Sequence, residues 1–130
     1  VPSTASNATT ASYALSASAA AGTFQIGAAQ QQYYGIASSV VGSNNLFTQA
    51  TGSFTSGFYN YTAYSASNAR SGQVMAVWNT GTTTFTDIAT TDIGSTTALT
   101  MSVSVISSQA QFNAQTNTSG WTIKSTVTYM

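Results

Sequence analysis

The side chains able to do acid–base or nucleophilic chemistry are few in this chain and far apart. Its four charged residues are Arg70, Asp87, Asp92 and Lys124, and it has no His, Cys or Glu. General acid–base catalysis normally uses His, Glu, Asp, Lys, Tyr or Cys with an adjusted pKa, and zinc sites use Cys, His and carboxylate ligands. The composition therefore disfavours an enzyme, and we expect no catalytic residue, metal site or bound cofactor.

The two carboxylates are five positions apart, which raises the question of a calcium site. Asp87 and Asp92 could both bind Ca²⁺ if main-chain carbonyls completed the shell of six to eight oxygens. Calcium loops normally supply more carboxylates than this. The alternative, which we favour, is that one Asp pairs with Arg70 and the other accepts hydrogen bonds from turn N–H groups.

Lys124 precedes Ser125, a pairing that suggests a Ser–Lys nucleophile. An activating lysine must be desolvated so that its pKa falls. Lys124, however, lies on the polar side of an alternating segment, where lysine is normally solvated. We therefore expect this pair to have no catalytic role.

An aromatic and polar run, FYNYTAY at 58–64, is the strongest candidate for a binding surface. Tyr59, Tyr61 and Tyr64 beside amides and hydroxyls are typical of adaptable recognition surfaces, such as those that hold sugars or proteins. The competing interpretation places Tyr59 and Tyr61 on one strand face, packed in the core or against another subunit. We favour the second interpretation, and the first stays open.

Neutral hydrogen-bonding groups dominate the rest of the chain. Of 130 residues, 43 are Ser or Thr, and the formal net charge is zero, so little repulsion keeps copies apart. Two cationic residues are too few to neutralise a nucleic-acid backbone, and no apolar run approaches the ~18 residues of a membrane-spanning helix. We expect a protein that self-associates and binds neither nucleic acid nor membrane.

The first 22 residues differ from the remainder. Sixteen of them are Ala, Ser or Thr, and such a stretch cannot bury enough apolar area to fold alone. We interpret residues 1–22 as an arm or linker, extended or ordered against neighbouring copies, and residues 23–130 as one domain.

From residue 23 the apolar period is two. Residues 99–105 and 121–129 alternate apolar with Thr, Ser or Lys, as half-buried strands do, and only Ser125 breaks the apolar side. The nearly continuous apolar run at 73–78 predicts a central strand buried on both faces. A Gly-containing loop at 79–81 joins it to a strand at 82–88, as in a hairpin.

Further strands are expected at 23–27, 32–41, 45–54, 57–66 and 109–116, with turns at 42–44, 56–57, 70–72, 94–95 and 117–120. No helix competes with them after residue 23. Many short strands rich in Thr, Tyr and Val predict an all-β fold, an antiparallel β-sandwich of jelly-roll type behind the N-terminal arm.

Several phrases of the sequence resemble a known group of proteins. They are SGQVMAVW at 71–78 with FTD at 85–87, DIGST at 92–96, SGWTIKS at 119–125, and TASYALS at 10–16. The phrases between 71 and 125 resemble the β-rich distal domains of tailed-bacteriophage fibres and other virion appendages, and TASYALS resembles the repetitive linker that precedes such domains. The resemblance implies a homotrimer on the surface of a virion, attached to other virion proteins through its arm, that contacts a glycan or protein of the host surface.

Two other functions fit part of the same pattern. A pilin-like subunit of a cell-surface filament would use residues 1–22 to complete a neighbour's sheet by strand addition, although that arm lacks the alternating large apolar residues of a donor strand. A carbohydrate-binding module would rest on Tyr59, Tyr61 and Tyr64. We expect a structural, non-enzymatic virion protein and keep both alternatives.

Overall fold

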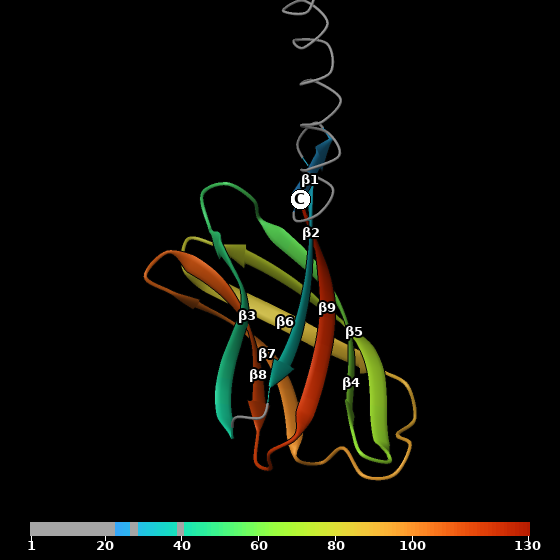
Figure 1. Ribbon diagram of the computed structural model, residues 1–130. Coiled ribbons are helices and arrows are strands. Elements are labelled where there is room, and N and C mark those ends of the chain that lie inside the picture. Colours follow the sequence, from blue (N-terminus) through green and yellow to red (C-terminus); the bar gives the residue numbers. More distant parts are fainter. Residues whose placement is uncertain (1–22, 27–28, 39–40) are drawn as a thin grey trace, which may run out of the picture.

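Two antiparallel β-sheets packed face to face form the fold (Figure 1), seen in a computed structural model that describes residues 23–26, 29–38 and 41–130. The expected all-β sandwich is therefore confirmed. The arm at 1–22 lies outside the described residues. The described part contains no helix, and hence no helix that could cross a membrane.

Nine strands follow one another along the described chain. They are β1 (Thr23–Ile26), β2 (Ala29–Ser38), β3 (Gly42–Ala50), β4 (Ser56–Ser65), β5 (Asn68–Asn79), β6 (Thr82–Ala89), β7 (Leu99–Ile106), β8 (Gln109–Thr116) and β9 (Trp121–Tyr129). The larger sheet has six strands in the order β1-β2-β9-β4-β5-β6, and the smaller has three in the order β3-β8-β7. Every expected strand is present, with ends shifted by up to five residues.

The core lies between the sheets because alternate residues of each strand point inward. On β9 the inward residues include Ile123, Val127 and Tyr129, which are buried together with Ser125, the polar exception. At the centre the ring of Tyr59 on β4 stacks on that of Phe112 on β8, with centroids 4.3 Å apart and planes 14° apart. Such contact between large aromatic side chains joins the two sheets.

Strand β5 differs from the prediction of a strand buried on both faces. Val74, Ala76 and Trp78 point inward and are buried, whereas Val77 on the other face is 51% exposed. A continuous apolar run indicates two-sided burial only when a second layer covers the sheet. Among the described residues no layer covers the outer face of β4, β5 and β6.

Tight turns join neighbouring strands, and some lie where Gly predicts them. Thr80 and Gly81 both have positive φ (47° and 89°) and close the predicted β5–β6 hairpin. The segments at 42–44, 56–57 and 70–72, expected to be turns, instead lie within β3, β4 and β5. The turn before β5 uses Ala66 (φ 51°) and Ser67, which carry no Gly or Pro signal.

Candidate functional site

Arg70, Tyr61 and Asp87 meet at the inner face of β4, β5 and β6. The Tyr61 hydroxyl donates to the Asp87 carboxylate, at 3.0 Å from Oδ1 and 3.1 Å from Oδ2. The Arg70 guanidinium carbon lies 5.8 Å from the centre of the Tyr61 ring. Sequence reasoning proposed a pair between Arg70 and an Asp, but in the structure the Asp87 carboxylate is bonded to the tyrosine that lies between the two.

The same guanidinium reaches the start of β7. Arg70 Nη1 donates to the Thr96 hydroxyl at 3.2 Å, and Nη2 donates to the Leu99 carbonyl at 3.3 Å. Thr96 itself is fully buried. Arg70 thus fastens the 90–98 loop to β5, a structural role for one of the chain's two cations.

Burial sets the chemistry of Tyr61. Desolvation is the larger cause, with the Asp87 charge second and opposed by Arg70, and together they raise the pKa of Tyr61 to about 12. The phenol therefore keeps its proton at neutral pH and donates to Asp87. This arrangement suits a hydrogen-bond donor better than a general base.

Lys124 and Ser125 are not brought together. As neighbours on β9 they point to opposite faces of the sheet: Lys124 is exposed, and Ser125 is buried in the core. The Lys124 ammonium lies 5.9 Å from the centre of the Tyr64 ring on the neighbouring strand β4. A Ser–Lys nucleophile needs the two side chains within hydrogen-bond reach, which this geometry does not provide.

The three candidate recognition tyrosines do not share a surface. Tyr59 (0% exposed) and Tyr61 (3%) point into the core, whereas Tyr64 is 40% exposed. The hydroxyls of Tyr59 and Tyr129 are buried without a hydrogen-bond partner among the described residues. Burial raises the pKa of Tyr129 to about 12 and that of Tyr59 further. Of the three tyrosines, Tyr64 is therefore the one that a ligand could reach from solvent.

The two aspartates are also separate in structure. Asp87 lies on β6, while Asp92 lies in the exposed loop that follows it. Among the described residues no three acidic, His or Cys side chains come close enough together to hold a metal ion.

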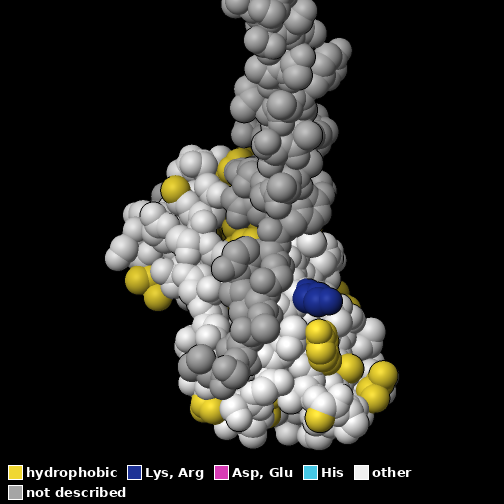
Figure 2. All heavy atoms as spheres, in the orientation of Figure 1, with side chains coloured by type: hydrophobic (Ala, Val, Ile, Leu, Met, Phe, Trp, Pro, Cys, Tyr) yellow, Lys and Arg dark blue, Asp and Glu magenta, His cyan; other side chains and the backbone are white. Residues whose placement is uncertain are grey.

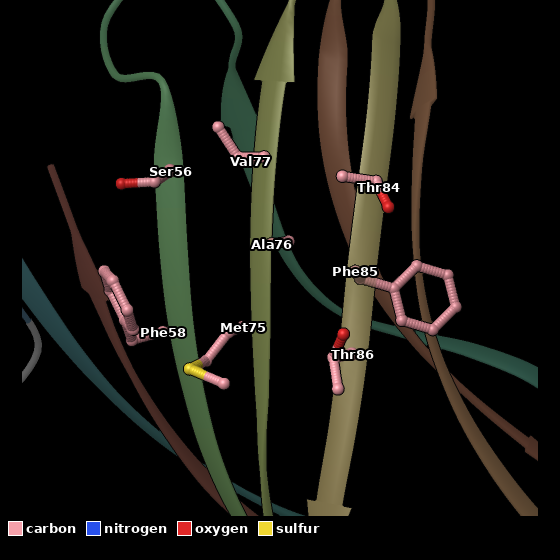
Figure 3. A pocket seen from close by; sticks show the side chains of 8 residues that line it. All are labelled: Ser56, Phe58, Met75, Ala76, Val77, Thr84, Phe85 and Thr86. Atoms are coloured by element: carbon pink, nitrogen blue, oxygen red, sulfur yellow. The ribbon is translucent and has the colours of Figure 1, made fainter.

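The outer face of β4, β5 and β6 is the most distinctive surface of the described chain, and sequence reasoning missed it. A shallow depression of about 420 Å³ lies here, lined chiefly by Ser56, Phe58, Met75, Val77, Thr84 and Thr86. Figure 3 shows Phe58 and Met75 side by side, and the Phe85 ring pointing to the other side of its strand. The sequence carries little local signal for this face, because the apolar run at 73–78 does not distinguish the two faces of β5.

Neutral polar side chains continue this face. The Gln73 amide donates to the Asn60 side-chain oxygen at 2.9 Å, and the Asn60 amide donates to the Thr126 hydroxyl at 3.4 Å. The hydroxyls of Thr62 and Ser71 lie 2.6 Å apart. In Figure 2 the visible side of the described residues is mostly uncharged, with separate hydrophobic patches and one small patch of Lys or Arg.

Comparison with models of known protein families gave no match, and comparison with curated proteins gave none. The candidate site therefore rests on geometry alone.

Proposed function

We propose that this chain is a structural module of a bacteriophage virion appendage, without enzymatic activity, that assembles as a homotrimer. The observation that carries the proposal is the open outer face of β4, β5 and β6. Val77 (51% exposed) and Ile88 (56%) lie there beside Phe58 and Met75, with no charged side chain among the residues lining the depression.

A surface of this kind favours association over solubility. Isolated exposed apolar residues are ordinary, but a contiguous apolar patch rimmed by neutral polar groups is typical of a contact surface. Burying such a surface requires no charge to be desolvated, and interface cores are depleted in charge for that reason. The number of copies and the virion location in this proposal are based on the resemblance of the sequence to virion appendage domains.

Two of the four charged residues have structural roles, which supports a protein without enzymatic activity. Arg70 and Asp87 take part in hydrogen bonds that join β4, β5, β6 and the loop before β7. Side chains committed to structure in this way are less suited to act on a substrate.

The molar mass in solution tests the proposal. Analytical ultracentrifugation of the full chain over a range of dilution is expected to give three times the chain mass of 13.4 kDa. A folded, stable monomer at all concentrations would contradict the trimer. Mass spectrometry of purified phage particles that encode the chain tests the virion location, and its absence from those particles would contradict that part.

Attachment to a host glycan is a second role within the same proposal. The exposed Tyr64 ring beside Lys124, continuous with the Asn60 and Gln73 amides, offers the combination of ring and hydrogen-bonding groups that holds sugars.

A further inference from the structure

Strand β6 is the open edge of the six-stranded sheet. It pairs with β5 on one side and, among the described strands, with none on the other. Seven of its eight residues are exposed and only Thr83 is half-buried, which distinguishes it from every other strand with described side chains. Phe85 (41%) and Ile88 (56%) are exposed on opposite faces of the strand.

Two hydrogen bonds identify which backbone groups of β6 face outward. The Thr90 N–H donates to the Ser71 carbonyl, and the Trp78 N–H donates to the Thr55 carbonyl on the β4 side. Backbone groups of successive residues alternate between the two sides of an antiparallel strand. Because Thr90 bonds to β5, the residues two and four positions before it, Ile88 and Thr86, have their N–H and C=O groups on the β5 side as well. The residues between them point the other way: the N–H and C=O groups of Thr83, Phe85 and Asp87 are directed to the open edge.

The β6 edge has few of the features that normally prevent an edge strand from pairing with a strand of another molecule. Native edge strands are protected by Lys, Pro, bulges or inward-pointing charges. Strand β6 has no Lys or Pro, and its register with β5 is unbroken from Thr82 to Ala89. The one protective feature it has is Asp87, an inward-pointing charge that accepts a hydrogen bond from Tyr61.

We propose that β6 pairs with β1 of a second copy, the opposite edge of the sheet among the described strands, so that the six-stranded sheets join head to tail. This inference rests on the proposed homotrimer and adds to it a contact at the sheet edge, which adjoins the outer face of β4, β5 and β6. Each of the five neighbouring pairs in the sheet is antiparallel, so β1 and β6 run in opposite directions. A second copy placed with β1 against β6 therefore continues the antiparallel pattern, with both inner faces on the same side.

Symmetry selects β1 over a second β6. Pairing of β6 with β6 is a twofold contact, which cannot by itself build a trimer, whereas a head-to-tail contact closes into a ring when the rotation allows. β1 consists of Thr, Phe, Gln and Ile and carries no charge that could repel Asp87, the one charged residue of β6.

The register of the sheet predicts which residues meet. A single row of paired residues crosses the whole sheet, from Phe24 at one edge to Thr86 at the other; between them it passes through Gln31, Thr128, Phe58 and Met75. Continued without a shift, the row places Phe24 of the next copy opposite Thr86. Because a closed sheet requires a stagger between strands, neighbouring registers must be tested as well.

Disulfide cross-linking tests this contact, and the chain contains no Cys that could interfere. The variant F24C/T86C is expected to form covalent dimers and trimers under mild oxidation, while the single variants F24C and T86C form none. The variants F24C/T84C and F24C/I88C test whether the contact is shifted by two residues in either direction. Circular dichroism checks that each variant is folded.

The outcomes separate the two proposals. Dimers of the single T86C variant would show β6 pairing with itself and overturn the inference. A trimeric mass without cross-links in any double variant would also overturn it, yet leave the proposed function standing. A monomeric wild-type chain would contradict both.

Hydrogen exchange of the wild-type chain gives a second test that needs no substitution. The N–H groups of Phe85 and Asp87 are expected to exchange slowly when the chain is trimeric and rapidly after dilution to monomer. Those of Thr86 and Ile88, bonded to β5, serve as internal controls and stay protected in both. Rapid exchange of Phe85 and Asp87 in the trimer would contradict strand pairing.

Discussion

The ring of Tyr61 covers Gly72, the residue directly opposite it on β5. A Cβ atom added at Gly72 would lie 2.7 Å from the Tyr61 hydroxyl oxygen and 2.8 Å from ring carbons. Gly72 therefore accommodates the tyrosine that bonds to Asp87, and this close approach explains a glycine in the middle of a strand.

Replacing Gly72 with Ala should displace the Tyr61 ring and destabilise the fold. Overpacking a well-filled core costs about 1–3 kcal/mol, measured as the free energy of unfolding in urea. G52A is the matched control, because nothing lies within 4 Å of a Cβ added there. Equal effects of the two substitutions would contradict this account of Gly72.

The hydrogen bond from Tyr61 to Asp87 should contribute measurably to stability. The variant Y61F keeps the ring over Gly72 and removes only the donor, with an expected loss of about 1–2 kcal/mol, since the acceptor is charged. The control Y64F alters an exposed tyrosine and should change the free energy of unfolding by less than about 0.5 kcal/mol. Unchanged stability of Y61F would show that the bond contributes nothing.

Arg70 should be replaceable neither by Ala nor by Lys. The variant R70K keeps the charge but cannot reach both Thr96 and the Leu99 carbonyl in the same fork geometry. We expect a loss of about 1–2 kcal/mol in urea unfolding, with faster amide exchange at Leu99. The control K124A removes an exposed cation and should be nearly neutral, and a neutral R70K would contradict the fastening role.

Stability should fall in alkaline solution. The pKa of Tyr61 and that of Tyr129 are each raised from 10.0 to about 12 by burial. Above pH 10 the unfolded chain loses these protons while the folded chain keeps them, so the unfolded state gains stability and the free energy of unfolding decreases. The effect is absent below pH 10 and grows between pH 10 and 12.

The urea midpoint measured from pH 8 to 11 checks this prediction. It should be level at first and decline from about pH 10, and the decline should be shallower in Y61F, which has one fewer buried phenol. A midpoint that is independent of pH across this range would contradict the shifted pKa values.

Glycan binding should depend on Tyr64 alone among the three candidate tyrosines. Binding to a glycan array should be lost in Y64A and retained in Y61F, whose altered atom lies in the core. Binding that survives in Y64A would remove this surface from consideration.

The sequence predicted the strands well because their alternation is local. Strands β7, β8 and β9 agree with the expected ranges within one residue, and the hairpin at Thr80 and Gly81 follows from its glycine. Glycine was less reliable elsewhere: Gly72 lies within β5 because Tyr61 needs its space, a long-range cause that local pattern cannot reveal.

The site was less predictable than the strands. Alternation places Tyr59 and Tyr61 on one face but does not say which face is buried, and that depends on the smaller sheet packing against it. The contact between Tyr61 and Asp87, 26 positions apart, depends on the register of two strand pairings. The open face of β5 follows only from the absence of a covering layer in the described chain.

The position of β9 between β2 and β4 has a consequence for how the protein folds. Tyr129 pairs with Gln30 on one side and Gly57 on the other, so the last strand joins segments that are distant along the chain. Such long-range pairing gives a high contact order, which slows folding. Until β9 is in place the larger sheet is two separate pieces, each with an open edge, and a nascent chain is exposed to misassembly during that interval.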